Sequence, residues 1–264
     1  MDTETEVSRW DIAEGFRDLG MAEGDILLLH SSLSRFGHVQ GGADTVIDGI
    51  LEAVGSTGTL LAPTLTGSEE LSPENAPHID LRSQPCWTGQ VAEALRQRAG
   101  AVRSTHPTHS CAAIGARARE LTQDHHRSPT PCGITSPYYR LAAAQGYIAL
   151  AGCGLDTCTT FHTVEELANV PYHLQTKTTF GTCIDDNGDR VETPCRLHSY
   201  LGPKRDFRIL EPQLLERGFM RTALIGQSMV RLVDAMGLIE TALDALRFDP
   251  FYLTILRGTQ VPKT

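Results

Sequence analysis

Short apolar runs alternate with helical repeats over the first two thirds of the chain. The runs at 26–30, 59–63 and 147–151 are typical of buried strands. Apolar residues three and four positions apart predict helices between and after these strands. The expected helices are 8–20 with Ser8 as its cap, 46–55, 88–100 with Thr88 as its cap, 136–146 starting at Ser136-Pro137, and 160–169.

The last third of the chain changes to antiparallel patterns. Segments 177–184 and 190–193 flank Asp185-Asp186-Asn187-Gly188-Asp189, and Asn-Gly favours the positive φ of a hairpin turn. Further expected elements are strands at 219–226, 228–233 and 251–256 and a helix through 238–246. Together the elements indicate an α/β fold, a mixed sheet with helices on its faces. No linker or repeat interrupts the chain, so a single domain over 1–264 is expected.

The chain has 264 residues, 41% hydrophobic and 21% charged, which is the composition of an ordinary globular protein. Its formal net charge of −9 argues against nucleic acid as a partner, because phosphates require a basic surface. The charge suits a cationic ligand, although solubility alone accounts for it more simply. The acidic segment 1–6 lacks the features of a signal peptide, and no apolar run could span a bilayer. A cytoplasmic protein without a membrane partner is expected, and nothing indicates its oligomeric state.

Seven cysteines are scattered along the chain without a Cys-x-x-Cys pair. They are expected to be reduced and mostly buried thiols, because neither a disulfide framework nor a structural zinc spacing is present. Their positions are 86, 111, 132, 153, 158, 183 and 195.

The first candidate site lies in the predicted helix 160–169. His162 and Glu165 are three positions apart and share a face, so the carboxylate can reach the imidazole. Such a carboxylate fixes the tautomer of an imidazole that acts as a general base. Spacing alone favours an exposed polar pair. The preceding Gly152-Cys153-Gly154-Leu155-Asp156 favours a site, because α/β proteins bind ligands at such turns after apolar strands.

Two further segments combine hydroxyl groups with a constrained backbone. In His106-Pro107-Thr108-His109-Ser110 the side chains are expected to bond a ligand's amides or the backbone. No third metal ligand follows at a recognised spacing, so no metal is expected. Ser31, Ser32 and Leu33 follow a buried strand, where N–H groups and hydroxyls can hold an anion or an amide. Capping of the next segment is an equally simple role for the two serines.

These segments, in this order, resemble the aminoglycoside 3-N-acetyltransferases of the antibiotic acetyltransferase family. The matching stretches are 28–34, 41–42 with the following helix, 58–63, 106–115, 136–137 and 152–172. The resemblance implies a fold distinct from the common N-acetyltransferase superfamily. It also implies transfer of an acetyl group from acetyl-CoA to the 3-amino group of a 2-deoxystreptamine aminoglycoside, an activity that confers antibiotic resistance.

The resemblance also implies roles for individual residues. His162 matches the catalytic histidine of the family's His-x-x-Glu motif, and Glu165 matches the paired carboxylate. The positions that match those holding pantetheine and phosphates are Ser31, Ser32, Leu33, Thr108 and Ser110. The substrate-binding candidates are Glu69 and Glu70, where the family carries acidic residues, and Asp156 in the glycine-rich turn.

The chain departs from the family pattern at two places. Cys158 stands where the family often has Asn before the catalytic helix. The segment 200–207 matches poorly where some relatives supply an acid to the acceptor, and Asp206 is the candidate substitute. Both changes are expected to affect the range of acceptors.

Two other classes of function stay open beside direct acetyl transfer with His162 as the general base. A hydrolase could use Cys153 or Cys158 as its nucleophile, although neither lies in a recognised hydrolase signature. Such an enzyme needs no coenzyme A. A silent module that binds cations or coenzyme A is the third class, and it releases no thiol.

Overall fold

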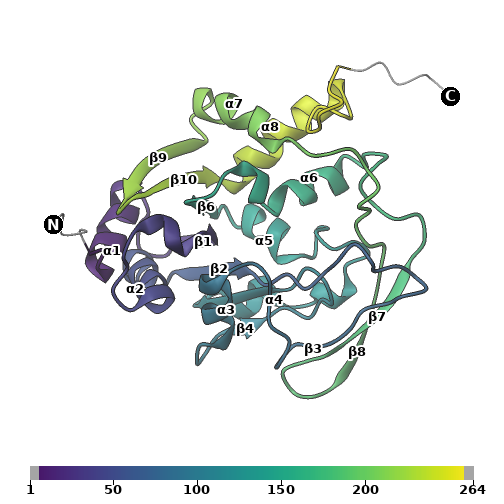
Figure 1. Cartoon of the computed structure of the whole chain (residues 1–264), viewed down its shortest axis with the longest axis horizontal. Coiled ribbons are helices and arrows are strands. Elements are labelled where there is room, and N and C mark those ends of the chain that lie inside the picture. Colours follow the sequence, from purple (N-terminus) through teal and green to yellow (C-terminus); the bar gives the residue numbers. More distant parts are fainter. Residues whose placement is uncertain (1–5, 259–264) are drawn as a thin grey trace.

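A seven-stranded mixed sheet forms the centre of the molecule (Figure 1). The computed structural model describes residues 6–258, and nothing is described for 1–5 and 259–264. Across the sheet the strands are β4 (Val102–Arg103), β5 (Cys111–Gly115), β2 (Thr59–Pro63), β1 (Ile26–Ser31), β6 (Tyr147–Ala151), β10 (Ser228–Asp234) and β9 (Met220–Ile225). Strand β1 pairs in parallel with β2 and β6, and the remaining pairs are antiparallel. The predicted mixed sheet is confirmed.

Helices cover both faces of this sheet, because its central strands send alternate side chains into two apolar cores. Leu27 and Leu29 of β1 belong to one core, and Ile26 and Leu28 belong to the other. The first core is closed by α1 (Arg9–Asp18), α2 (Gly42–Val54) and α3 (Gln90–Gln97). The second is closed by α4 (Ala118–Thr122), α5 (Pro137–Ala143), α6 (Thr160–Leu167), α7 (Glu211–Glu216) and α8 (Ala235–Phe248).

A second, three-stranded sheet lies beside the central one (Figure 1). Strand β7 (Thr179–Ile184) forms an antiparallel hairpin with β8 (Arg190–Cys195) and pairs in parallel with β3 (His78–Asp80). The predicted hairpin turn is confirmed, because Gly188 has a φ of 89° and Asp185 accepts two backbone N–H groups of the turn. Strand β3 has too few residues to show a period, and the sequence does not predict it.

Two of the three predicted helix caps are present. The Ser8 and Ser136 side chains accept backbone N–H groups of α1 and α5. The third is wrong, because α3 begins after Gly89 without a side-chain cap. The Thr88 hydroxyl donates instead to the carbonyl oxygen of Pro63, at the end of β2.

The predicted last strand, 251–256, is wrong. This segment is a series of turns, with one bridge between Thr254 and Arg205. The Asp249 carboxylate accepts the N–H group of Phe251, and the Thr254 hydroxyl donates to the Phe251 carbonyl oxygen. These local side-chain bonds compete with a strand ladder.

Within residues 6–258 no helix is long and apolar enough to cross a membrane. The cytoplasmic location and the single domain over 1–264 stay predictions, and most of the acidic segment 1–6 lies outside the described residues. All seven cysteines are free and five of them are buried, as predicted.

Candidate active site

A tight turn after β6 brings the start of α6 to one end of the central sheet. Gly152 has a φ of 69°, and a Cβ atom there would lie 2.4 Å from Cβ of Arg35. Glycine is therefore the residue that fits this turn without strain. A short 3-10 helix, η3 (Leu155–Thr157), precedes α6. Because β1 and β6 are parallel neighbours, their carboxyl ends open to the same space.

His162 and Glu165 form a hydrogen-bonded pair on α6. The Nδ1 atom of His162 lies 2.7 Å from Oε2 of Glu165. Glu165 is completely buried, whereas the His162 side chain is 28% exposed. Phe161 and Val164 hold the helix in the second core. The carboxylate therefore reaches the imidazole as predicted, and the pair is not an exposed surface pair.

Glu165 has further partners from distant parts of the chain. Nε of Arg205 lies 3.0 Å from its Oε1, and Nδ1 of His173 lies 3.0 Å from its Oε2. The Arg205 guanidinium also lies over the Tyr172 ring, 5.1 Å from its centroid. Burial opposes ionisation of Glu165, but hydrogen bonds from His162 and His173 hold its pKa well below the usual range. A charged, fixed carboxylate can orient His162.

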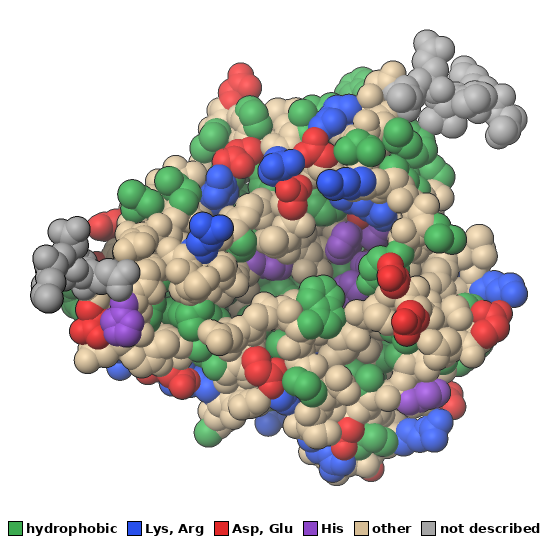
Figure 2. Space-filling model, viewed as in Figure 1, with side chains coloured by type: hydrophobic (Ala, Val, Ile, Leu, Met, Phe, Trp, Pro, Cys, Tyr) green, Lys and Arg blue, Asp and Glu red, His purple; other side chains and the backbone are tan. Residues whose placement is uncertain are grey.

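Several histidine side chains lie in a hollow of the face shown in Figure 2. The ring of His162 stacks on His173, with centroids 5.1 Å apart, and lies 4.9 Å from the ring of His198. The His109 ring follows, 4.3 Å from His198. Burial lowers the pKa of His173 to about 4 and those of His109 and His198 well below the usual range. These three rings are therefore neutral at pH 7.

Glu166, the next residue on α6, contacts the far side of this histidine cluster. Its Oε1 atom accepts hydrogen bonds from Nε2 of His198 and from the backbone N–H group of Cys132, both at 2.8 Å. Burial raises the pKa of Glu166 to about 8. The two neighbouring carboxyl groups therefore differ in charge and in partners.

A cavity of about 480 Å³ lies at the carboxyl ends of β1 and β2 and extends to His162. Its volume is that of a pocket for a small-molecule ligand. Its wall combines apolar side chains with hydroxyl and thiol groups and includes the start of α3. Its lining residues include Ser31, Cys153, Asp156, Cys158 and His162.

The first three predicted cofactor residues lie at or beside this cavity. Ser31 lines it at the end of β1. Ser32 precedes the 3-10 helix η1 (Leu33–Phe36), and Leu33 begins it. Part of the Leu33 side chain packs on the first core. The segment follows a buried strand, as its pattern predicts, and Ser31 borders a ligand-sized space.

Thr108 and Ser110 lie elsewhere and are buried. The Thr108 hydroxyl is 2.9 Å from Nδ1 of His109. The Ser110 hydroxyl donates to the carbonyl oxygen of Thr64 and accepts from Nε of Arg103. Neither residue lines the cavity of about 480 Å³, and both hydroxyls are bonded to protein groups.

Of the three acidic substrate candidates, only Asp156 lines the cavity. Asp156 lines the cavity, and its carboxylate lies 2.8 Å from Nε of Arg208. Glu69 and Glu70 lie exposed on the segment that follows β2. Burial, and after it the charge of Glu69, raises the pKa of Tyr200.

Asp206 and the two thiols at the cavity are not free reactive groups. The Asp206 carboxylate forms ion pairs with Arg208 and Arg257. Burial raises the pKa of Cys158 to about 12 and also raises that of Cys153. Because the thiolate is the nucleophilic form of cysteine, protonated thiols at neutral pH disfavour a cysteine hydrolase.

The sequence gives no signal for several residues of this site. Arg205 is 40 residues from its partner Glu165, and His198 is 32 residues from Glu166. Their contacts depend on loops that fold back on α6, and no period or motif spans such distances.

The fold and the site define an α/β protein in which an imidazole–carboxylate pair borders a ligand-sized cavity. The sequence model of the aminoglycoside 3-N-acetyltransferase family matches residues 28–247. Aminoglycoside N(3)-acetyltransferase VIII of Streptomyces fradiae is 36% identical over 187 residues, which cover 62% of this chain and 63% of that protein. Aminoglycoside N(3)-acetyltransferase IX of Micromonospora chalcea is 31% identical over 261 residues, which cover 87% of this chain and 89% of that protein.

Solved structures have the same fold. The crystal structure of aminoglycoside acetyltransferase AAC(3)-Xa superposes with a TM-score of 0.79 at 32% identity, covering 94% of each chain. AAC-IIIb, solved as a binary complex with CoASH, superposes with a TM-score of 0.79 at 27% identity, and the match covers 92% of this chain and 97% of that one. AAC-VIa bound to sisomicin superposes with a TM-score of 0.76 at 26% identity, and the match covers 92% of this chain and 98% of that one. This chain belongs to the aminoglycoside 3-N-acetyltransferase family.

Proposed function

We propose that this protein transfers the acetyl group of acetyl-CoA to the 3-amino group of a 2-deoxystreptamine aminoglycoside and thereby confers resistance. The observation that carries the proposal is the His162–Glu165 pair, 2.7 Å apart, at a cavity of about 480 Å³ in a chain of this family. Acyl transfer to an amine requires a proton acceptor of this kind beside a bound ligand.

The two substrates are supported by the neighbours of known structure. AAC-IIIb was solved with CoASH, and AAC-VIa was solved with sisomicin. We extend both ligand classes to this chain because its fold covers more than nine tenths of each of these two chains.

In the proposed reaction the amine attacks the thioester carbonyl, so a C–N bond forms and the C–S bond breaks. His162 accepts the amine proton at Nε2, because its Nδ1 is bonded to Glu165. The proton then passes to the departing sulfur, and coenzyme A leaves as a thiol. Glu165 stays ionised and stabilises the imidazolium. Such general-base catalysis contributes about 10² to 10⁴ in rate, and proximity of the two bound substrates contributes as much or more.

We assign the coenzyme A end of the cavity to Ser31, Ser32 and Leu33. Ser31 lines the cavity, and its hydroxyl makes no hydrogen bond to any residue among 6–258, so the residue can donate to pantetheine or to the developing oxyanion. Thr108 and Ser110 act indirectly in this proposal. Ser110, for example, holds the backbone just after β2, whose end forms part of the cavity wall.

We assign the cationic acceptor to the acidic candidates. Asp156 lies on the cavity wall, and Glu69 and Glu70 are exposed on the segment after β2. The net charge of −9 favours the approach of a polycationic substrate. An ammonium group that pairs with one of these carboxylates is held while one neutral amine of the same substrate reacts.

The decisive experiment mixes acetyl-CoA with a panel of 2-deoxystreptamine aminoglycosides and follows release of the coenzyme A thiol. We expect thiol release that depends on the acceptor, a product heavier by one acetyl group, and an NMR shift at position 3. A reaction without acceptor is the control for simple hydrolysis. Thiol release at the control rate with every acceptor would overturn the proposal and favour a silent binding module.

A further inference from the structure

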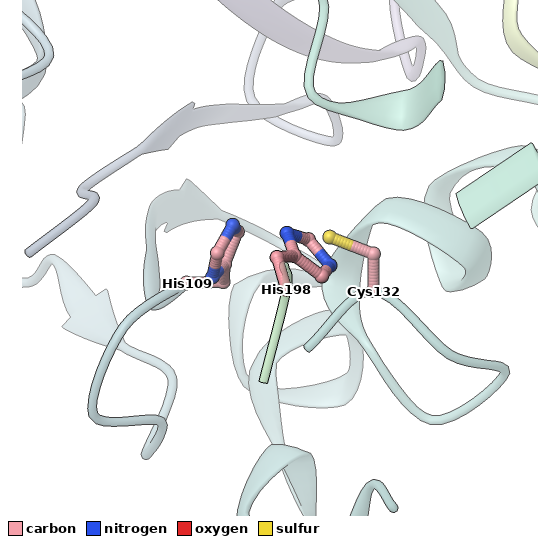
Figure 3. Close-up of side chains that lie close together, drawn as sticks. All are labelled: His109, Cys132 and His198. Atoms are coloured by element: carbon pink, nitrogen blue, oxygen red, sulfur yellow. The ribbon is translucent and has the colours of Figure 1, made fainter. Parts of the chain in front are cut away.

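Three potential metal ligands from distant segments meet beside the candidate active site (Figure 3). His109 precedes β5, Cys132 precedes α5, and His198 follows β8. One ring nitrogen of each histidine and the sulfur of Cys132 all lie within 4.8 Å of one another. All three side chains are buried, so no bulk water separates them.

Each imidazole of this group is fixed through one nitrogen and has a second nitrogen available. Nδ1 of His109 is 2.9 Å from the Thr108 hydroxyl, and Nε2 of His198 is 2.8 Å from the Glu166 carboxyl group. The other ring nitrogens make no hydrogen bond to a residue within 6–258. Metal-binding histidines are commonly held in this way, with the distal nitrogen bonded to a carboxylate or another polar group.

The donor set suits a borderline-soft metal ion. Two imidazoles and one thiolate are typical ligands of Zn²⁺, which binds four donors in a tetrahedron. The neutral imidazole ring and the thiolate are the forms of these side chains that bind a metal ion. The bound ion also deprotonates a ligating thiol.

We propose that His109, Cys132 and His198 bind a divalent transition-metal ion, with Zn²⁺ as the favoured ion and a water molecule as the fourth ligand. A cavity of about 10 Å³ borders both histidines. That volume is close to the minimum that holds one water. The ion would tie three loops together and fix His198 against His162. This proposal replaces the expectation of no metal, because ligands from three separate segments have no spacing to recognise.

A second group, His162, His173 and His198, shares one ligand with the first. Nδ1 of His162 and Nδ1 of His173 both contact the Glu165 carboxylate, and this group contains no thiolate. An ion there would also occupy the proposed base. The thiol-containing group is therefore the better site.

The test adds Co²⁺ to protein from which metal has been removed by chelation. We expect about one ion per chain, with the visible bands of tetrahedral cobalt and a thiolate-to-cobalt charge-transfer band, both displaced by Zn²⁺. Cys132→Ala should lose the charge-transfer band. Cys183→Ala, at another buried thiol on β7, is the matched control and should keep it.

Two further variants keep the result interpretable. Thr108→Val preserves shape and removes the hydroxyl beside His109, so we expect cobalt affinity to fall about 10- to 100-fold. His162→Ala should leave the spectrum unchanged. The proposal is overturned if the wild-type protein binds no cobalt, or if Cys132→Ala keeps the full spectrum while His162→Ala loses it. These readouts do not depend on acetyl transfer, so they are separate from the test of the enzymatic activity.

Discussion

Glu165 and Glu166 are neighbours on α6, both are buried, and their carboxyl groups behave in opposite ways. Glu165 has an arginine and two imidazoles as partners, and its pKa lies well below the usual range. Glu166 bonds His198 and a backbone N–H group, pairs with no Arg or Lys among residues 6–258, and burial raises its pKa to about 8. Burial disfavours the ionised form of both glutamates. The Arg205 cation and the imidazoles of His162 and His173 therefore decide that Glu165 is the one that ionises.

This difference separates two tasks within one helical turn. Glu165 holds a charge that orients His162, which borders the candidate active-site cavity. Glu166 orients His198, which belongs to the proposed metal group. Substitutions on either side should therefore have different consequences for turnover and for stability.

The largest effect is expected for His162→Ala, on the Glu165 side. Loss of the base should lower turnover at least roughly a hundredfold, while the dissociation constant for coenzyme A stays nearly unchanged. Steady-state kinetics and calorimetric titration measure the two quantities. His78→Ala, an exposed histidine on β3, serves as the control. Near wild-type turnover of His162→Ala would show that the base is wrongly assigned.

The next effect compares Glu165→Gln with Glu166→Gln. The first removes a buried charge from Arg205 and should lower the free energy of unfolding by about 3 kcal/mol. The second keeps an acceptor for His198 and should cost about 1 kcal/mol or less. Urea denaturation at neutral pH measures both. Equal losses would mean that the two carboxyl groups do not differ as described.

Acid sensitivity sharpens the same comparison. The pKa of Glu165 is lowered in the folded state, so its contribution to stability is present above the unfolded value of about 4.3 and is lost as pH falls below it. This loss reaches up to about 1.4 kcal/mol per pH unit. Glu165→Gln should remove that part of the slope in urea denaturation between about pH 5 and about pH 3. An unchanged slope would contradict the lowered pKa.

The smallest effect is expected where a substitution touches neither glutamate. Cys158→Ala and Cys153→Ala should keep turnover within about tenfold, because both thiols are protonated and neither is a nucleophile. Alkylation followed by mass spectrometry and an activity assay makes the same point in the unaltered protein. Complete loss of activity in a correctly folded Cys158→Ala variant would instead favour an enzyme that uses Cys158 as its nucleophile.

Much of the central fold was predictable because its signals are local. Apolar runs marked β1, β2 and β6, and Ser8 and Ser136 marked two helix starts. Short elements such as β3, β4 and α4 carry too few residues for a period to appear. The segment 251–256 has an apolar pattern, but Asp249 and Thr254 bond the local backbone and turn it. The confirmed predictions are therefore those of elements whose signal comes from residues close together in the sequence.

By itself the sequence determined the mixed α/β fold, the glycine turn before α6, and the reach of Glu165 to His162, because three residues of helix set that distance. The tertiary structure decided the charge of each glutamate, since Arg205 and His198 arrive from loops far along the chain. It also assembled His109, Cys132 and His198 into one group. Long-range contacts of this kind depend on the folding of several loops at once, and no local pattern encodes them.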